Sequence, residues 1–222
     1  MTQIDSEKKL DRLKLSKLLK TIYKDHTTEE INFICNQLLQ ILDNFSEKSR
    51  YEEISGEIKW DESYAVLITY ADGVYKKGEA TLVTLRDLLS KHFGSLSKVV
   101  HILPFLKSTS DGGFAVSSHK SLEEKFGSWE DLNSISNKHF LMADLVLNHV
   151  SSSHPWVQQF IKCQEPGFSN VFSPSQDLDW KNVIRPRSSS LFSQINTEDG
   201  QKQVWTTFGP DQIDLNWLNP KM

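Results

Sequence analysis

Three short apolar segments, separated by stretches with a helical pattern, constrain the fold of this chain more than any other feature. The segments cover residues 65–70, 99–105 and 140–147. Between them the leucines of residues 82–89 recur at helical spacing before a glycine, and Ser128 begins a second helical stretch. Strands that alternate with helices form parallel sheets, because right-handed crossovers bring each strand back in the same direction. The pattern therefore predicts a parallel α/β sheet, either open or part of a barrel.

The first part of the chain has a different pattern, that of helices without strands. Over residues 10–22, apolar side chains recur among lysines at loose helical spacing. Thr27 and Glu30 have the spacing of a capping box, and an apolar stripe follows over residues 31–45. Such a stripe suits a membrane or a protein partner, but charges of both signs flank it, which favours packing within its own domain. We predict a helical N-terminal extension over residues 1–60.

Composition divides the rest of the chain into three parts. Residues 61–150 are expected to hold three β/α units, and residues 151–216 form an insertion rich in Ser, Pro, Asp and aromatic side chains. Residues 217–222 are expected to lead toward a fourth strand. Within the insertion we expect a short helix at Pro155 and irregular structure from there to Pro210. Long insertions after the carboxyl end of a strand usually carry a function.

Charge and cysteine content exclude several classes of function. The 222 residues include 25 Lys and Arg against 29 Asp and Glu, a net charge of −4, which gives no electrostatic basis for nucleic-acid binding. Cys35 and Cys163 have no CxxC partner, so neither a disulfide framework nor a zinc site is indicated. Acidic residues come before any apolar run near the start, so we expect no export signal, and no segment approaches the roughly 18 apolar residues of a membrane span. We expect a cytoplasmic protein that binds neither nucleic acid nor membrane.

Polar side chains just after the strand ends are the first candidates for a site, since α/β proteins place their sites there. Asp144 lies within the third apolar segment, Asn148 and His149 follow it, and the three are expected to converge at one rim; Asp111 and Phe114 flank a Gly-Gly turn after the second segment. Carboxylates beside aromatic rings are typical of sugar sites, because the carboxylate accepts hydroxyl hydrogen bonds and the ring packs on the sugar's CH face. A structural explanation stays open: Asp144 can form a salt bridge and His149 can cap a loop.

Further candidates lie after the first strand and in the insertion. Tyr70 and Asp72 follow the first apolar segment. Arg185 and Arg187 flank a proline and are suited to bidentate capture of phosphate or carboxylate, although two solvated arginines are the usual outcome for so short a cluster. Residues 204–217 are rich in aromatic, acid and amide side chains. That composition fits a sugar-binding surface, and equally a loop packed on its own domain.

In chain order, these motifs resemble the N-terminal half of the sucrose-phosphorylase branch of the α-amylase superfamily, glycoside hydrolase family 13. Asp144 with Asn148-His149 is similar to the first signature region of that family, and Gln212-Ile-Asp-Leu-Asn216 is similar to its fifth. The sequence around Trp205-Thr-Thr-Phe208 and the helical extension are most similar to those of the glucosylglycerate phosphorylases. The other matching segments are Ile68-Thr-Tyr-Ala-Asp72, His101-Ile-Leu-Pro-Phe105, Asp111-Gly-Gly-Phe114, Gly127-Ser-Trp129 and Arg185-Pro-Arg187.

The resemblance implies a (β/α)8 TIM barrel, of which this chain holds the first three strands and the domain inserted after strand three. It implies a retaining glycosyltransferase, a phosphorylase that moves an α-glucosyl group to phosphate by double displacement and gives α-glucose 1-phosphate. Inorganic phosphate is then the co-substrate, and no cofactor or metal is implied. By the same resemblance Arg187 binds phosphate or an anionic acceptor such as glycerate, and the glucoside is bound by Asp111, Phe114, His149, Phe208 and Gln212.

The two catalytic carboxylates of this family belong to strands four and five, and are therefore expected after Met222. We expect no catalytic residue among residues 1–222, and expect this chain alone to be poorly stable and without phosphorylase activity. Ile184 stands where sucrose phosphorylases usually place a tyrosine, which favours glucosylglycerate over sucrose as the donor.

Three alternatives stay open at this point. The first is an α-glucoside hydrolase of the same superfamily, in which water replaces phosphate. The second is a non-catalytic remnant, or a half-barrel subunit that pairs with a separate chain supplying the rest of the barrel. The third is a doubly wound nucleotide-binding domain, against which the absence of a GxGxxG or P-loop motif after the first strand argues.

Overall fold

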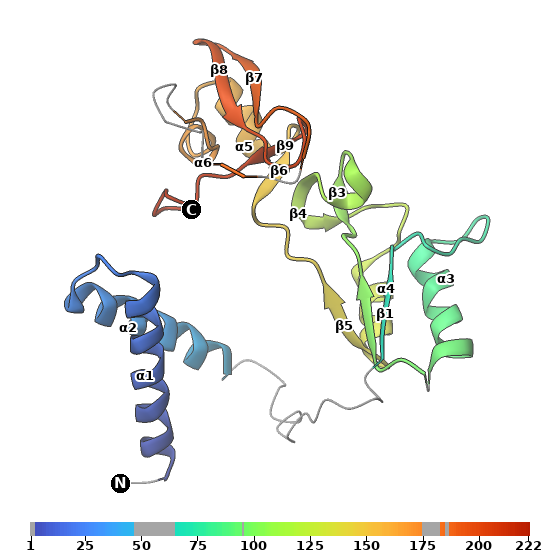
Figure 1. The fold of residues 1–222 in the computed structure, drawn as a ribbon. Helices are drawn as coiled ribbons and strands as arrows, with labels where there is room; N and C mark the ends of the chain where they lie inside the picture. The colour runs from blue at the N-terminus through green and yellow to red at the C-terminus, as the bar shows by residue number, and fades with distance from the viewer. Residues whose placement is uncertain (1–2, 47–64, 95, 175–182, 185–186) are drawn as a thin grey trace. The chain divides into compact units, whose positions relative to one another are not determined.

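The computed structural model describes residues 3–46, 65–94, 96–174, 183–184 and 187–222 (Figure 1). The chain divides into two compact units, Met1–Lys59 and Trp60–Met222. The first unit has a small apolar core of its own, and the second has two.

The N-terminal unit is a pair of helices, α1 (Gln3–Ile22) and α2 (Thr28–Ser46). The predicted capping box begins α2: the Glu30 N–H donates to Thr27 Oγ1 at 3.3 Å, and the Thr27 N–H donates to Glu30 Oε2 at 2.7 Å. The early part of the apolar stripe packs on α1, where Leu19, Ile31 and Cys35 are buried. The helices are confirmed, but the stripe is only partly covered, since Ile41 and Leu42 are exposed.

The second unit begins with a parallel sheet of order β1-β2-β5. Its strands are β1 (Val66–Thr69), β2 (Val99–Ile102) and β5 (Phe140–Ala143), with Val66 opposite Val99 and Val99 opposite Phe140. Helical segments form the crossovers, namely α3 (Thr81–Leu88), which continues as the π-helical turn η2 (Leu89–Phe93), and α4 (Trp129–Ser136). This confirms the predicted parallel α/β sheet. Within the described residues the sheet stays open and closes no barrel.

The core of this sheet lies between the strands and the crossover helices. Leu82 and Leu85 of α3 and Ile135 of α4 are buried against Val100 and Ile102 of β2. Ser128 and Asp131 form a capping box that fixes the start of α4, as the sequence predicts. The central strand is thus almost fully buried, whereas the flanking strands expose alternate apolar side chains: Val66, Ile68, Phe140 and Met142.

After β2 the chain forms an antiparallel pair, β3 (Leu106–Ser108) with β4 (Val116–Leu122), joined through the short 3₁₀ turn η3 (Asp111–Gly113). All three residues of η3 have positive φ: 54° at Asp111, 60° at Gly112 and 105° at Gly113. A Cβ at Gly113 would lie 2.3 Å from the carbonyl oxygen of Pro104. This close approach requires glycine there, so the Asp-Gly-Gly sequence fixes the path of the turn.

The insertion is more ordered than its sequence predicts. The expected helix at Pro155 is present as α5 (Pro155–Ile161), followed by α6 (Gly167–Asn170). The expectation of irregular structure is wrong for the hairpin β7 (Phe192–Thr197) and β8 (Gly200–Trp205). Its signal is the Asp-Gly pair of residues 199–200, which is typical of a tight turn between strands.

The two ends of the insertion meet in a second antiparallel pair. Strand β6 (His149–Ser151) opens the insertion and β9 (Gln212–Asp214) closes it, with His149 opposite Asp214 and Ser151 opposite Gln212. Behind this pair lies a separate apolar core, in which Val150, Val157, Phe160, Val171, Val204 and Ile213 are buried. The insertion therefore has its own packing and presents β6 and β9 as one rigid edge.

His154 caps the first turn of α5 with a neutral ring. Its Nδ1 accepts a hydrogen bond from the Trp156 N–H at 3.2 Å, so that nitrogen carries no proton. Burial, with a smaller contribution from the neighbouring His119, lowers the pKa of His154 from 6.5 to about 4.

We expect the free energy of unfolding to fall as the pH drops from the unfolded value of about 6.5 toward about 4, because over this window the unfolded chain binds a proton that folded His154 does not. The loss at the acid end is at most about 3 kcal/mol. Urea unfolding at several pH values measures it. The control is His154→Asn, which keeps a capping acceptor that does not titrate. A difference between wild type and variant that stays constant over the window would contradict the expectation.

Candidate functional site

One cavity of about 350 Å³ brings together the residues that the sequence predicts for the site. This strand-end cavity lies where the turn after β2 approaches the β6–β9 edge. Its lining comprises all of the predicted site residues together with Tyr70 and Gly112: Tyr70, Asp111, Gly112, Phe114, His149, Arg187, Phe208 and Gln212. Their separation along the chain means that the fold, and not local sequence, assembles the site.

A polar floor connects η3 with β6 and β9. The Gln212 side-chain amide donates to Asp111 Oδ2 at 2.8 Å, and the same nitrogen lies 3.3 Å from His149 Nε2. His149 Nε2 also lies 3.2 Å from the carbonyl oxygen of Phe114. Because a carbonyl oxygen can only accept, the tautomer with the proton on Nε2 suits this contact. Three residues from distant segments are thus fixed relative to one another.

The imidazole of His149 is kept neutral. Burial lowers the pKa of His149, although Asp214, the Phe114 carbonyl and Asp111 oppose the shift. Its Nδ1 is buried and has no hydrogen-bond partner within the described part of the chain. The ring therefore acts in this cavity as an uncharged hydrogen-bonding group.

Phe208 and Arg187 add an aromatic ring and a cationic group to the lining of the cavity. The Phe208 ring lies 5.0 Å from the His149 ring, with an angle of 52° between their planes. The guanidinium carbon of Arg187 lies 5.7 Å from the centre of the Phe208 ring. Arg187 is exposed and lines the cavity. Arg185 and Pro186, the other members of the predicted Arg-Pro-Arg element, lie outside the described residues.

Asp214 supports the floor from behind. It is buried and accepts hydrogen bonds from the Thr207 N–H at 3.1 Å, from Thr207 Oγ1 at 2.5 Å and from Asn148 Nδ2 at 3.3 Å. Burial raises the pKa of Asp214, and the hydrogen bonds from Thr207 and Asn148 oppose this shift in part. Sequence reasoning placed Asp214 within the fifth-region motif but gave it no role.

Asp144 pairs with a side chain of the neighbouring strand, as the structural explanation for this residue predicts. Its Oδ2 lies 2.9 Å from His101 Nε2 on the neighbouring strand β2. It does not line the strand-end cavity, and the expected convergence of Asp144 with His149 at one rim is therefore wrong. The reason is that β5 ends at Ala143 and the chain runs on for several residues before β6 begins at His149.

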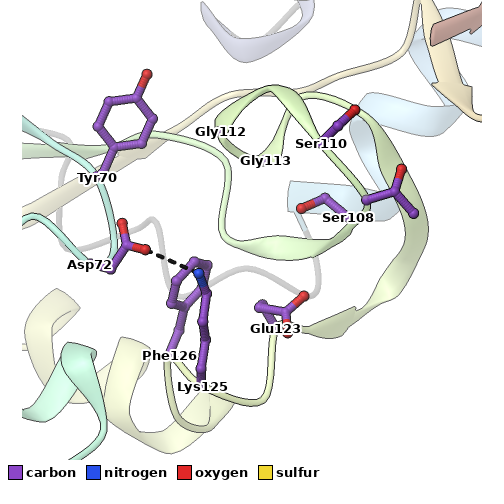
Figure 2. Close-up of a pocket in the computed structure, with 10 residues that line it drawn as sticks. Tyr70, Asp72, Ser108, Ser110, Gly112, Gly113, Glu123, Lys125 and Phe126 are labelled. Carbon is purple, nitrogen blue, oxygen red and sulfur yellow. Dashed lines mark hydrogen bonds and ion pairs between the residues drawn. The ribbon is translucent and has the colours of Figure 1, made fainter. Parts of the chain in front are cut away.

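Tyr70 is the lining residue that was left out of the predicted site, although its position after β1 marked it as a candidate. It also lines a second cavity of about 380 Å³ on the other side of η3, shown in Figure 2. There Lys125 Nζ lies 3.1 Å from Asp72 Oδ2, the contact drawn as a dashed line. A Cβ at Gly112 would lie 3.0 Å from the Tyr70 ring, so this glycine makes room for the ring between the two cavities.

The sequence analysis predicts neither a metal site nor a membrane-spanning segment. Among the residues whose structure is described, no three His, Cys, Asp or Glu side chains gather as a metal site would require. The absence of a metal stays a prediction. In the same ranges no helix combines the length and apolarity needed to cross a bilayer.

The parallel sheet and the polar, aromatic cavity beyond its strand ends define an α/β protein with one candidate site at those strand ends. Residues 93–222 match the family model for the catalytic domain of alpha-amylase, which is more than half of the chain. The chain belongs to the alpha-amylase family. This confirms the resemblance on which the sequence interpretation rests.

Several relatives that the chain matches are named as sugar phosphorylases. The chain is 44% identical to the glucosylglycerate phosphorylase of Allomeiothermus silvanus over 165 aligned residues. The aligned region is 73% of this chain and 29% of that protein. The chain is 37% identical over 216 residues to the glucosylglycerate phosphorylase of Spirochaeta thermophila, covering 96% of this chain and 36% of the relative. The crystal structure of sucrose 6F-phosphate phosphorylase from Thermoanaerobacter thermosaccharolyticum superposes with a TM-score of 0.64 at 29% identity, over 74% of this chain and 36% of that one. The chain thus spans about a third of the length of these relatives.

Proposed function

We propose that the strand-end cavity binds the α-glucosyl unit of a glucoside in a glycoside phosphorylase reaction, with inorganic phosphate as the co-substrate. The observation that carries this proposal is that Gln212 donates to Asp111 and lies beside His149, whose ring is held at the Phe114 carbonyl, in a cavity that aromatic rings also line. Glucosylglycerate is the donor we favour over sucrose. The names of two similar relatives and the replacement of the usual tyrosine by Ile184 support that choice.

The side chains of the cavity suit this chemistry in distinct ways. The Asp111 carboxylate can accept hydrogen bonds from glucose hydroxyls while Gln212 holds it in place. Phe114 and Phe208 offer ring faces for the apolar face of the sugar. Arg187 supplies a positive charge for phosphate or for the carboxylate of glycerate. All of these groups bind and orient the substrate, and none of them is proposed to form the covalent intermediate.

The catalytic carboxylates remain, in this proposal, outside residues 1–222, as the family resemblance implies. Asp111 is engaged by Gln212, and Asp214 is buried behind the cavity with its oxygens already bonded. A nucleophile needs a free oxygen beside the anomeric carbon, which Asp214 does not offer; the role proposed for Asp111 is to bind sugar hydroxyls. We therefore propose that the 222-residue chain by itself forms no glucose 1-phosphate.

The test begins with the protein captured from its own cells by an antibody against residues 1–60, whose intact mass is measured. If its mass exceeds the 25.5 kDa of this chain, we expect the captured protein to convert glucosylglycerate and phosphate to α-glucose 1-phosphate, and to use sucrose less well. We expect Asp111→Ala to lower kcat/KM by about 10- to 100-fold, since it removes charge-assisted hydrogen bonds to the sugar. Asp199→Ala, at an exposed hairpin turn, is the control and should leave kcat/KM unchanged.

Different outcomes separate the alternatives. Release of free glucose in place of glucose 1-phosphate would identify a hydrolase. No turnover of either glucoside by the captured protein would contradict the phosphorylase proposal and favour a non-catalytic remnant. Activity that appears only when a second polypeptide co-purifies would identify a half-barrel subunit.

A further inference from the structure

The Asp211 carboxylate accepts hydrogen bonds from two separate segments beside the strand-end cavity. Thr109 Oγ1 and Ser110 Oγ each donate to its Oδ2 at 2.7 Å. Its Oδ1 accepts from the Ser152 N–H at 3.3 Å and from the Ser152 hydroxyl. The Ser152 N–H also donates to the Asp211 backbone carbonyl at 3.2 Å. One side chain thus joins the loop before η3, the segment after β6 and the start of β9.

Each of these segments carries a polar residue of the cavity. Ser110 directly precedes Asp111, Asp211 directly precedes Gln212, and Ser152 follows the strand that begins with His149. Asp211 itself does not line the cavity. Its hydrogen bonds therefore fix the geometry from outside, at a place where a bound sugar does not interfere with them.

The charge of Asp211 is retained in this setting. Burial favours protonation, but the hydrogen bonds from Ser152, Ser110 and Thr109 outweigh it and lower the pKa of Asp211. An ionised carboxylate accepts all of these bonds at once, which a neutral side chain of the same size does not.

The turn it holds is closed by local backbone hydrogen bonds: Gly113 N–H to Ser110 O at 3.3 Å, Phe114 N–H to Asp111 O at 3.1 Å and Thr109 N–H to Ala115 O at 3.0 Å. These bonds lie within the turn and its flanks, and none of them reaches β6 or β9. Across the cavity, η3 contacts β6 and β9 through the Gln212–Asp111 and His149–Phe114 hydrogen bonds. A sugar that enters the cavity competes for these same polar atoms, so an anchor outside the cavity is needed to keep the turn in place.

We infer that Asp211 is a positioning residue: by tying η3 to the β6–β9 edge, its carboxylate sets the spacing of Asp111, His149 and Gln212 and so determines the affinity of the cavity for its ligand. The sugar identity of that ligand rests on the proposed function. The spacing itself does not, and can be measured without any ligand.

Asp211→Ala tests the inference against a matched control in the same unit. Asp131 is also an aspartate that accepts hydrogen bonds from a serine, with Ser128 N–H and Oγ both at 2.9 Å, but it caps α4 and does not line the cavity. We expect Asp211→Ala to speed hydrogen exchange of the amides of residues 113–115 by about tenfold or more, and Asp131→Ala to leave them unchanged. Both variants are compared under conditions where both are folded.

Affinity provides the second readout, with α-glucose 1-phosphate as the probe in titration calorimetry on the full chain. We expect the dissociation constant to rise about tenfold or more in Asp211→Ala and to stay within about twofold in Asp131→Ala. Asp211→Asn should lie between wild type and Asp211→Ala. Its amide oxygen still accepts from the Ser152 N–H, and the Thr109 and Ser110 hydroxyls can rotate to accept from its NH2 group.

Several results would overturn the inference: unchanged exchange at residues 113–115 in Asp211→Ala, equal effects of Asp211→Ala and Asp131→Ala, or a loosened turn with unchanged affinity. If the wild-type chain does not bind α-glucose 1-phosphate, the proposal that the cavity binds a glucosyl unit is contradicted for this ligand. The exchange data then decide whether Asp211 positions the turn, so the two failures are distinguishable.

Discussion

Replacing Gly113 by alanine is expected to destabilise the second unit by about 2–5 kcal/mol and to abolish ligand binding at the strand-end cavity. Two physical costs add. A positive φ of 105° costs a residue with a Cβ about 1–2 kcal/mol. The new methyl group would also lie 2.3 Å from the Pro104 carbonyl oxygen, and relieving that overlap costs about 1–3 kcal/mol more. The turn must move, and Asp111 moves with it. Chemical denaturation and titration with α-glucose 1-phosphate measure both effects.

Gly200 provides the matched control for the backbone cost. It has a φ of 102°, and a Cβ there would meet no atom within 4 Å. Gly200→Ala therefore isolates the conformational cost, and we expect it to lower the free energy of unfolding by about 1–2 kcal/mol without changing ligand affinity. Equal losses in the two variants would show that the contact with Pro104 is unimportant.

The second large effect is expected for Phe160→Ala in the core of the insertion. Phe160 is fully buried among Val150, Val157 and Ile213, and truncation of a buried phenylalanine costs about 3–5 kcal/mol because a cavity remains. Since Val150 belongs to β6 and Ile213 to β9, the loss should loosen the edge that carries His149 and Gln212. Hydrogen exchange at residues 149–151 and 212–214 reports this directly.

Phe168 is the control for this substitution. It stacks on Phe160 with ring centres 5.7 Å apart but is partly exposed. We expect Phe168→Ala to cost about 1 kcal/mol, the contribution of the ring pair, and to leave exchange at β6 and β9 near the wild-type rate. If the two variants lose the same stability, the insertion has no buried core of the kind described.

The parallel sheet could be predicted from the sequence because its signals are local and agree with one another. Val99 and Val100 lie in an apolar run of strand length, and Ser128 with Asp131 has the spacing of a helix cap. The β7–β8 hairpin was missed because its strands are largely polar: it is half exposed, and its clearest signal is the turn at residues 199–200. The composition of residues 192–205 alone predicts a loop.

The cavity residues could be named in advance through the resemblance to a family, but their spacing could not. Asp111 and Gln212 are far apart in the chain, and nothing local indicates that one accepts a hydrogen bond from the other. For the same reason Asp144, which the pattern placed with His149, pairs with His101 of the neighbouring strand. Asp211 directly precedes the Gln212–Asn216 motif, yet its role follows from contacts with Thr109, Ser110 and Ser152 that periodicity does not reveal.

The pairing of β6 with β9 makes the insertion an excursion whose two ends are hydrogen-bonded to each other. Its length can therefore vary without altering the edge that faces the cavity, provided that the excursion keeps its own apolar core. The tip of the β7–β8 hairpin at residues 198–199 is exposed and lies at the end of this excursion. It is a position where evolution can lengthen the chain, or an experimenter can graft a fluorescent label, while the geometry of the binding residues is preserved.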